Sequence, residues 1–136
     1  MQILLIEDDL LEQARFSQTL ALLHFEIIII HAEDGQEALD ILTTAKTLPN
    51  LILLDLNMPR LNGIEFLKKI RTMPNLKLIP VVVFSTSTNL SDINSCYELG
   101  IASFIQKPFD HKLYKETVKS LINYWSIRTL HTITPK

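Results

Sequence analysis

Cysteine and glycine are scarce in this sequence, and both shortages exclude classes of protein. A single cysteine, Cys96, makes a disulfide within the chain impossible. The three glycines, Gly35, Gly63 and Gly100, form neither the phosphate loop nor the dinucleotide fingerprint of nucleotide-binding proteins. We therefore expect neither an internal disulfide nor a nucleotide-binding module of those types.

Long apolar runs and basic runs are also missing. No apolar run exceeds the four residues from Ile27 to Ile30, which is far too short to span a bilayer. The formal net charge is −2, and no stretch is rich in lysine and arginine, so a nucleic-acid surface is not expected. The start of the chain, MQILLIEDD, carries no basic side chain and differs from a secretory signal peptide. We expect a cytoplasmic protein that binds neither membrane nor nucleic acid.

The chain has 136 residues and is 47% hydrophobic, which is typical of one globular domain. Apolar runs alternate with stretches of helical periodicity. Asp34 and Glu37 predict a capping box at the start of the second helix, and Gly100 predicts the end of the fourth. The predicted strands are residues 2–6, 25–30, 51–54, 81–84 and 103–105, and the predicted helices are residues 10–23, 34–46, from 62 onward, 89–99 and 110–125.

Strands that alternate with helices predict an α/β fold with a parallel sheet covered by helices on both faces. The strands are continuous apolar runs, as expected when both faces of a sheet are buried. The predicted fold is a flavodoxin-like, doubly wound sheet of five parallel strands in the order 2-1-3-4-5, with five helices. Ligands bind such sheets at the carboxyl ends of the strands.

Polar residues follow four of the five predicted strands. They are Glu7-Asp8-Asp9 after the first, Asp55 after the third, Ser85-Thr86-Ser87 after the fourth and Gln106-Lys107-Pro108 after the fifth. In the predicted order these four strands are contiguous. Carboxylates, hydroxyls and one ammonium should therefore meet at one edge of the sheet.

Carboxylates that meet at such an edge repel one another, and a hard divalent cation relieves the repulsion. Mg²⁺ prefers oxygen ligands and is typically held by one or two carboxylates with phosphate oxygens. Lys107 supplies a point charge suited to a phosphoryl group, and Ser85 supplies a hydroxyl donor. Each residue alone has a simpler role, as a turn, cap or surface residue. Together they predict a site where Asp55 acts as nucleophile toward a phosphoryl group.

The residues resemble the receiver domains of two-component response regulators, whose fold is the CheY-like form of the flavodoxin-like fold. The resemblance extends from ILLIEDD (3–9) through LLDLNMPRLNG (53–63) and VVVFSTS (81–87) to FIQKPF (104–109). Each motif alone is moderately specific. The four motifs in this order and spacing are highly specific.

The resemblance implies a role for each residue of the site. Asp55 would be the phosphoacceptor, and Glu7, Asp8 and Asp55 would hold Mg²⁺ together with the backbone carbonyl of Asn57. Lys107, Ser85 and Thr86 would bind the phosphoryl group, and Ser85 and Phe104 would form the conformational switch. The Lys107–Pro108 peptide is expected to be cis, and Pro59 and Gly63 are expected to shape the turn after the site.

Two positions depart from the commonest residues of the family. Threonine is most frequent where this chain has Ser85, and tyrosine alternates with phenylalanine where it has Phe104. Because Phe104 has no hydroxyl, we expect its ring to switch by packing rather than by hydrogen bonding.

The resemblance also implies partners. Within the family, RTMPNLKLIPVVVFSTS, SCYELGIASFIQKPFD and INYW are most similar to single-domain regulators paired with phytochrome-type histidine kinases of cyanobacteria. A sensor histidine kinase would then be the phosphoryl donor, and the chain would signal by phosphorylation-dependent contact with a further protein. The chain would be a signalling protein, not an enzyme.

The expected organisation is a receiver domain at residues 1–125 and an extension at residues 126–136, with no output domain. Ile127, Leu130 and Ile133 recur at three-residue spacing there and follow Tyr124 and Trp125. One interpretation is a frayed tail. The other is a cover for a homodimer interface on the last helix and neighbouring elements, and we expect a homodimer.

Two alternative functions remain open at this point. The protein could be a phosphorelay intermediate that passes its phosphoryl group to a histidine of another protein. It could also be a phosphatase of the haloacid dehalogenase type, which forms an aspartyl phosphate after a strand. That class usually has a second aspartate two residues beyond the nucleophile. Asn57 at this position argues against it.

Overall fold

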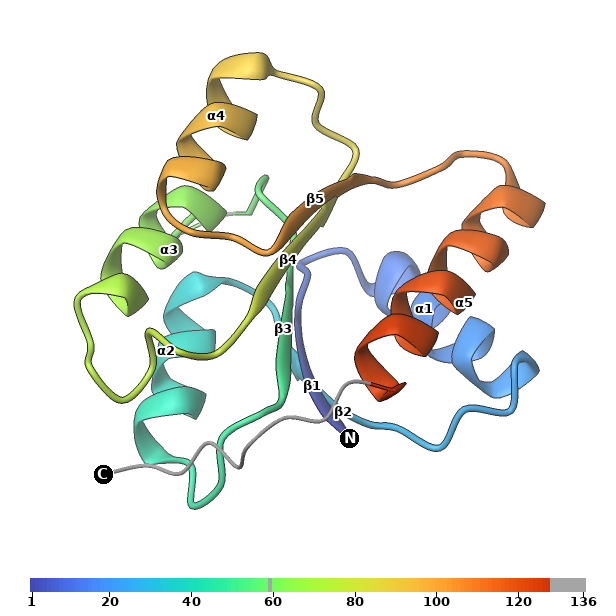
Figure 1. Ribbon diagram of the computed structural model, residues 1–136, viewed down its shortest axis with the longest axis horizontal. Coiled ribbons are helices and arrows are strands. Elements are labelled where there is room, and N and C mark those ends of the chain that lie inside the picture. The colour runs from blue at the N-terminus through green and yellow to red at the C-terminus, as the bar shows by residue number, and fades with distance from the viewer. Residues whose placement is uncertain (59, 128–136) are drawn as a thin grey trace.

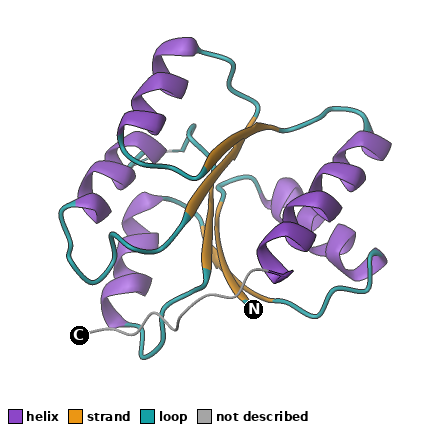
Figure 2. Ribbon diagram, viewed as in Figure 1, coloured by secondary structure: helices purple, strands orange, loops and turns teal. Residues whose placement is uncertain are grey.

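Residues 1–58 and 60–127, which the computed structural model describes, form five parallel strands and five helices that alternate along the chain (Figures 1 and 2). The strands are β1 (Gln2–Ile6), β2 (Ile28–Ala32), β3 (Leu51–Leu54), β4 (Val81–Ser85) and β5 (Ser103–Gln106). The helices are α1 (Leu10–Leu22), α2 (Gly35–Thr44), α3 (Gly63–Arg71), α4 (Leu90–Glu98) and α5 (His111–Ile127).

The strand order is β2-β1-β3-β4-β5, and every neighbouring pair is parallel. The predicted doubly wound sheet with order 2-1-3-4-5 is therefore confirmed. This order places β1 and β3 side by side at the point where the direction of winding reverses. The carboxyl ends of such neighbouring strands are the usual ligand site of an open α/β sheet.

Helices cover both faces of the sheet (Figure 1), with α1 and α5 on one face and α2, α3 and α4 on the other. Successive strand residues alternate between the two faces, as the pleat requires. In β1, Ile3 and Leu5 pack under α1 and α5, whereas Leu4 and Ile6 pack under the other three helices. Burial on both faces accounts for the continuous apolar runs.

The second strand lies three residues later than predicted at its start. Helix α1 ends at Leu22, and the chain then turns through His24, whose φ is +60°. Phe25 is tied to this turn, since its N–H donates to the carbonyl of Leu20 at 3.1 Å. Pairing with β1 therefore begins only at Ile28. Apolarity alone could not separate the connecting residues from the strand.

Helix starts follow the expected capping chemistry, with one difference. The Asp34 side chain accepts from the Glu37 N–H at 2.9 Å and caps α2. The reciprocal capping box, however, is formed at α3 by Asn62 and Glu65. Asp110 accepts from the Leu113 N–H at 2.8 Å at the start of α5, as predicted. In the part of the chain that is described, no helix has the length and apolarity needed to cross a bilayer.

Candidate functional site

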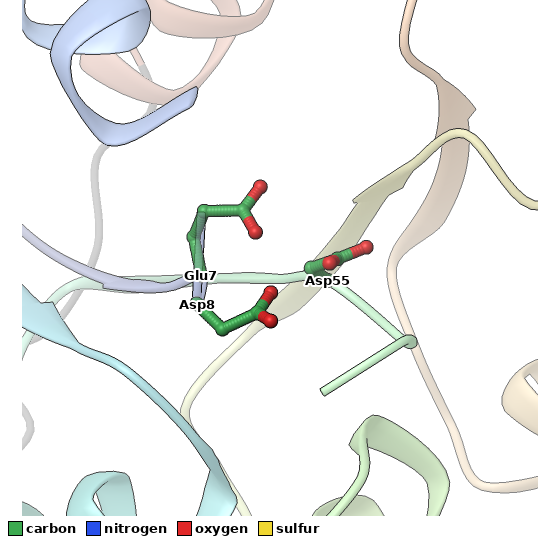
Figure 3. Close-up of side chains that lie close together, drawn as sticks. All are labelled: Glu7, Asp8 and Asp55. Atoms are coloured by element: carbon green, nitrogen blue, oxygen red, sulfur yellow. The ribbon is translucent and has the colours of Figure 1, made fainter. Parts of the chain in front are cut away.

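The strand pairing brings the two acidic segments together. Ile6 and Leu54 are the last paired residues of β1 and β3, and the Asp55 N–H continues the ladder by donating to the Ile6 carbonyl at 3.0 Å. The next residues, Glu7 and Asp8, lie beside Asp55 at the same edge of the sheet. Figure 3 shows all three side chains in one small region.

Glu7, Asp8 and Asp55 form an acidic cluster, in which one carboxylate oxygen from each residue lies within 4.8 Å of the others. Their exposure differs: Glu7 is buried, Asp55 is half-buried and Asp8 is exposed. One Asp55 oxygen already accepts from the Leu56 N–H at 2.9 Å, which fixes the carboxylate against its own turn. The cluster is thus anchored on its inner side and open on its outer side.

Lys107 supplies the positive charge next to this cluster. Its ammonium is buried and forms an ion pair with the Glu7 carboxylate. Burial raises the pKa of Glu7 to about 7, although the hydrogen bond and charge of Lys107 act in the opposite direction. The neighbouring charge of Asp55 also raises the pKa of Glu7. Burial and the Asp55 charge both disfavour the charged form of Glu7, and a cation held by the cluster would stabilise that form.

Ser85 lies at the end of β4 and is fully buried. Its hydroxyl oxygen accepts from the Ser87 N–H at 3.3 Å, and its carbonyl accepts from the Lys107 N–H at 2.9 Å. The structure therefore joins Ser85 and Lys107 through the backbone at the end of the sheet. The predicted cis Lys107–Pro108 peptide is wrong, because this bond is trans. Trans is the lower-energy isomer of most bonds before proline, and the Lys107 N–H and ammonium both find their partners in this form.

The other predicted site residues lie at the rim. Thr86 is exposed directly after β4. Asn57 and Asp8 line one hollow of about 410 Å³ with Asp92 of α4. Phe104 lies on β5, half-buried against the core under α2, α3 and α4, and its N–H donates to the Tyr97 hydroxyl at 3.1 Å. Pro59 lies outside the described residues, and Gly63 is the first residue of α3.

The donor set fits a hard divalent cation. Three carboxylates offer oxygens within 4.8 Å of one another, and the exposed side of Asp8 leaves room for the waters that Mg²⁺ usually keeps. No sulfur or imidazole ligand belongs to this cluster, so its chemistry favours Mg²⁺ or Mn²⁺ over softer metals.

Comparison with known proteins identifies the family of this chain. Residues 3–119 match the sequence profile described as the response regulator receiver domain. The chain belongs to the response regulator receiver domain family. Proteins of this family are signalling proteins, and the acidic cluster, Lys107 and Ser85 lie at the strand ends where a receiver domain is expected to carry its site.

Two known regulatory proteins are similar to this chain in sequence. The response regulator Rcp1 of Synechocystis is 34% identical over 137 residues, which cover 97% of this chain and 90% of that protein. A probable methanogenesis regulatory protein, FilR2 of Methanothrix harundinacea, is 35% identical over 127 residues, which cover 90% of this chain and 82% of that protein. The similarity thus extends over most of the length of both relatives.

Solved structures agree with the sequence relatives. The phosphorylated cyanobacterial phytochrome response regulator RcpA superposes with a TM-score of 0.87 at 33% identity and covers 99% of this chain. That match also covers 98% of RcpA. The Mn²⁺-bound form of Rcp1 has a TM-score of 0.85 at 32% identity, with 99% of each chain covered. This receiver domain is therefore related to phytochrome response regulators.

Sequence reasoning missed several residues that support the site. Gln13 of α1 donates its side-chain N–H to the Glu7 carbonyl at 2.7 Å. Glu12 lies 3.7 Å from the Lys107 ammonium. Both residues could have been predicted to lie near the site, because they are in the first turn of the helix that follows Glu7 and Asp8. Arg60, which binds the buried Asp34 carboxylate with N–O distances of 2.6 Å, carried no such signal.

Proposed function

We propose that this receiver domain accepts a phosphoryl group on Asp55 from a histidine of a sensor kinase, in the presence of Mg²⁺. The observation that supports the proposal is the acidic cluster of Glu7, Asp8 and Asp55 next to the buried ammonium of Lys107. Opposite charges at one rigid edge can bind a phosphoryl group and the cation that accompanies it.

The transfer step assigns a role to each side chain. An Asp55 carboxylate oxygen forms a bond to phosphorus, and the bond from phosphorus to the donor nitrogen breaks, leaving its electron pair on the imidazole. The Lys107 ammonium then balances the negative charge of the phosphoryl oxygens, and Ser85 and Thr86 donate hydrogen bonds to them. The chain acts only on its own Asp55 and is therefore a signalling protein rather than an enzyme.

In this proposal, Mg²⁺ would be held by Glu7, Asp8, Asp55 and the backbone carbonyl of Asn57. Asp8 would bind directly, and the buried Glu7 would act largely through water. The bound cation would neutralise the oxygens of the transferring group. Ser85 and Phe104 would report phosphorylation, since the half-buried ring can pack more deeply when the Ser85 hydroxyl moves toward the phosphoryl group.

A protein donor fits the surroundings of Asp55. Exposed apolar side chains lie next to the rim on two elements: Leu11 in the first turn of α1 and Phe109 between β5 and α5 are 80% and 86% exposed. Apolar groups at such positions favour docking of another protein surface. Sequence and structural similarity to RcpA and Rcp1 supports a phytochrome-type histidine kinase as the phosphoryl donor.

Signal output in this proposal is a protein–protein contact in the cytoplasm. Residues 1–125 would form the receiver domain, and residues 126–136 its extension, most of which lies outside the described residues. A groove of about 740 Å³ between β5 and α5, lined by Leu113, Thr117 and Leu121 among others, offers an apolar surface for a second copy of the chain. A homodimer built on α5 would cover it.

The phosphoacceptor role is tested by Asp55→Asn. Wild-type protein incubated with Mg²⁺ and acetyl phosphate should gain the mass of one phosphoryl group in intact-mass spectrometry. The Asp55→Asn variant should gain none, because the amide is not a nucleophile here. Asp40→Asn, at an exposed position of α2, should behave as wild type. Lys107→Ala should still accept some phosphate but lose the structural response. Absence of any mass gain in the wild type would sink the proposal.

A further inference from the structure

The ammonium of Lys107 contacts two carboxylates. Besides its ion pair with Glu7, it lies 3.7 Å from Oε2 of Glu12, in the first turn of α1. The Lys107 side chain is 9% exposed and that of Glu12 is 29% exposed. Since both side chains are largely buried, their attraction is less screened than that of a surface pair.

The Glu12 oxygen that faces Lys107 is incompletely satisfied. Among the residues that the structure describes, Glu12 Oε2 is the buried side-chain oxygen without a hydrogen-bond partner. A buried carboxylate oxygen in this state is costly. The contact with Lys107 at 3.7 Å is too long for a hydrogen bond, but a small movement of the lysine would complete it.

Glu12 also connects this lysine to α5. Its other oxygen lies 3.9 Å from the Arg15 guanidinium. Arg15 stacks on the Tyr114 ring at 3.7 Å and donates to the Phe109 carbonyl at 3.5 Å. The chain of contacts therefore runs from Lys107 through α1 to the loop and helix that follow β5.

We propose that Glu12 is a positioning residue that competes with the Asp55 phosphoryl group for the Lys107 ammonium. The inference rests on the proposed function, because it assumes that Lys107 binds that group. In the resting protein, Glu7 and Glu12 together hold the ammonium. When Asp55 carries a phosphoryl group, Lys107 turns toward it, and Glu12 retains only Arg15.

The first experiment compares the affinity of variants for beryllofluoride, a phosphoryl mimic, in Mg²⁺. Glu12→Gln keeps the shape of the side chain but removes its charge, so Lys107 is held by Glu7 alone. We expect the dissociation constant to fall about three- to fivefold, in line with the modest strength of partly exposed ion pairs. Fluorescence of Trp125 or a methyl NMR signal can follow the titration.

Asp92→Asn is the matched control for this comparison. Asp92 also lies in the first turn of its helix and lines the hollow next to Asp8, but no ion pair joins it to Lys107 within the described chain. If Asp92→Asn lowers the dissociation constant as much as Glu12→Gln does, general charge repulsion explains the effect and the proposal is overturned. An unchanged constant in Glu12→Gln also overturns it.

A second experiment needs neither metal nor phosphoryl mimic. Urea unfolding in EDTA is measured for wild type, Glu12→Gln, Lys107→Gln and the double variant. If Glu12 holds Lys107, the shifts of the urea midpoint should not add, whereas additive shifts would contradict the contact. If the Lys107 variants do not fold, the affinity comparison decides alone. The two experiments can also disagree. If the wild type does not bind beryllofluoride but the urea midpoint shifts are non-additive, the proposed function is refuted and the contact between Glu12 and Lys107 is supported.

Discussion

Burial separates neighbouring carboxylates at the site. Glu7 and Asp8 are adjacent, yet Glu7 is 3% exposed and Asp8 lies in solvent. The alternation of a strand continues past its last paired residue and turns one side chain inward and the next outward. The inward carboxylate meets Lys107, and the outward one faces the hollow that Asn57 lines. Glu7 and Asp8 are both carboxylates, but Glu7 pairs with the buried lysine and Asp8 is open to solvent.

Arg60 and Asp34 form a second ion pair near the site. The Asp34 carboxylate is buried and caps α2. It accepts a hydrogen bond from Nε of Arg60 and forms an ion pair with Nη2 of the same guanidinium. Arg60 has a φ of +60°, which is strained for a residue other than glycine. It lies three residues after Asn57, so the ion pair holds the loop that carries a proposed metal ligand.

This ion pair should make stability depend on pH. Burial raises the pKa of Asp34, but hydrogen bonds from Arg60 and from the Glu37 N–H outweigh it and hold the pKa below its usual value. A lowered pKa stabilises the fold above the unfolded value of about 4, and this contribution is lost as the pH falls through the folded pKa. The wild type should therefore exceed Asp34→Asn in unfolding free energy at pH 7, and the difference should shrink as the pH falls below about 4.

Urea unfolding at several pH values measures this difference. Asp34→Asn retains an oxygen that can cap α2. The unfolding free energy that this variant loses therefore reports the contribution of the Asp34 charge. Asp34→Ala also removes the cap and should cost about 1 kcal/mol more at every pH. A difference between wild type and Asp34→Asn that stays constant from pH 7 to pH 2 would contradict the assignment.

At the scale of elements, the start of α3 is fitted closely to the end of β3. The Gly63 N–H donates to the Leu56 carbonyl at 3.1 Å. A Cβ at Gly63 would lie 2.7 Å from the Asp55 carbonyl oxygen and 2.8 Å from the Leu56 Cα. Both are backbone atoms, which cannot move aside without shifting the residue that carries the proposed nucleophile. This close approach explains why glycine opens α3.

Gly63→Ala should therefore damage stability and the site together. We expect a loss of about 1–3 kcal/mol in unfolding free energy, as for other overpacked positions. The affinity for Mg²⁺, followed by fluorescence titration, should fall because Asp55 is displaced.

Gly100→Ala is the control for this substitution. A Cβ at Gly100 would make only an ordinary contact, 3.7 Å from Arg71 Nε, but the φ of Gly100 is +80°, so alanine there should cost about 1 kcal/mol of backbone strain. It should leave Mg²⁺ affinity unchanged because Gly100 lies at the opposite end of α4 from the site. Equal loss of Mg²⁺ affinity in both variants would argue against the close-approach explanation.

At the scale of the whole molecule, two hydrophobic clusters hold the described residues together, one on each face of the sheet. The core under α1 and α5 includes Phe16, Tyr114 and Trp125, and the other core includes Phe66 and Leu67. This second core continues past the end of β3 through Leu56, Met58 and Leu61. The polar site therefore rests on a rigid apolar base and needs no cavity in the interior.

The outer side of α5 leads to a prediction about assembly. Leu113 is 52% exposed and lines the groove between β5 and α5. If a second copy covers this groove, sedimentation should show a dimer at tens of micromolar protein. Leu113→Glu should shift the protein to monomer, because it would bury an unpaired charge in the interface.

Leu22→Glu serves as the control for the assembly experiment. Leu22 is 59% exposed at the end of α1, outside this groove, so its substitution should leave the dimer intact. A wild type that sediments as a monomer with and without beryllofluoride would remove the dimer from the proposal.

The sequence by itself determined the order of the elements, the parallel sheet and the edge at which the polar residues meet. Strands buried on both faces need continuous apolar runs, as in residues 51–54, and helices need the periodicity and caps that this chain shows. Because parallel strands present their carboxyl ends together, Glu7, Asp8, Asp55, Ser85 and Lys107 could be assigned to one edge without coordinates. The largest error was at the start of β2, an edge strand with a turn before it. Other element ends differ by one or two residues, and the capping box lies at α3 rather than at α2.

The tertiary structure alone decided which partner each charged group takes. Lys107 is 100 residues from Glu7, and Arg60 is 26 residues from Asp34. Such pairs depend on side-chain rotamers and on the packing of separate elements, for which sequence spacing has no periodic signal. The place of Glu12 beside Lys107 belongs to the same class, because it depends on how α1 lies relative to the residues that follow β5.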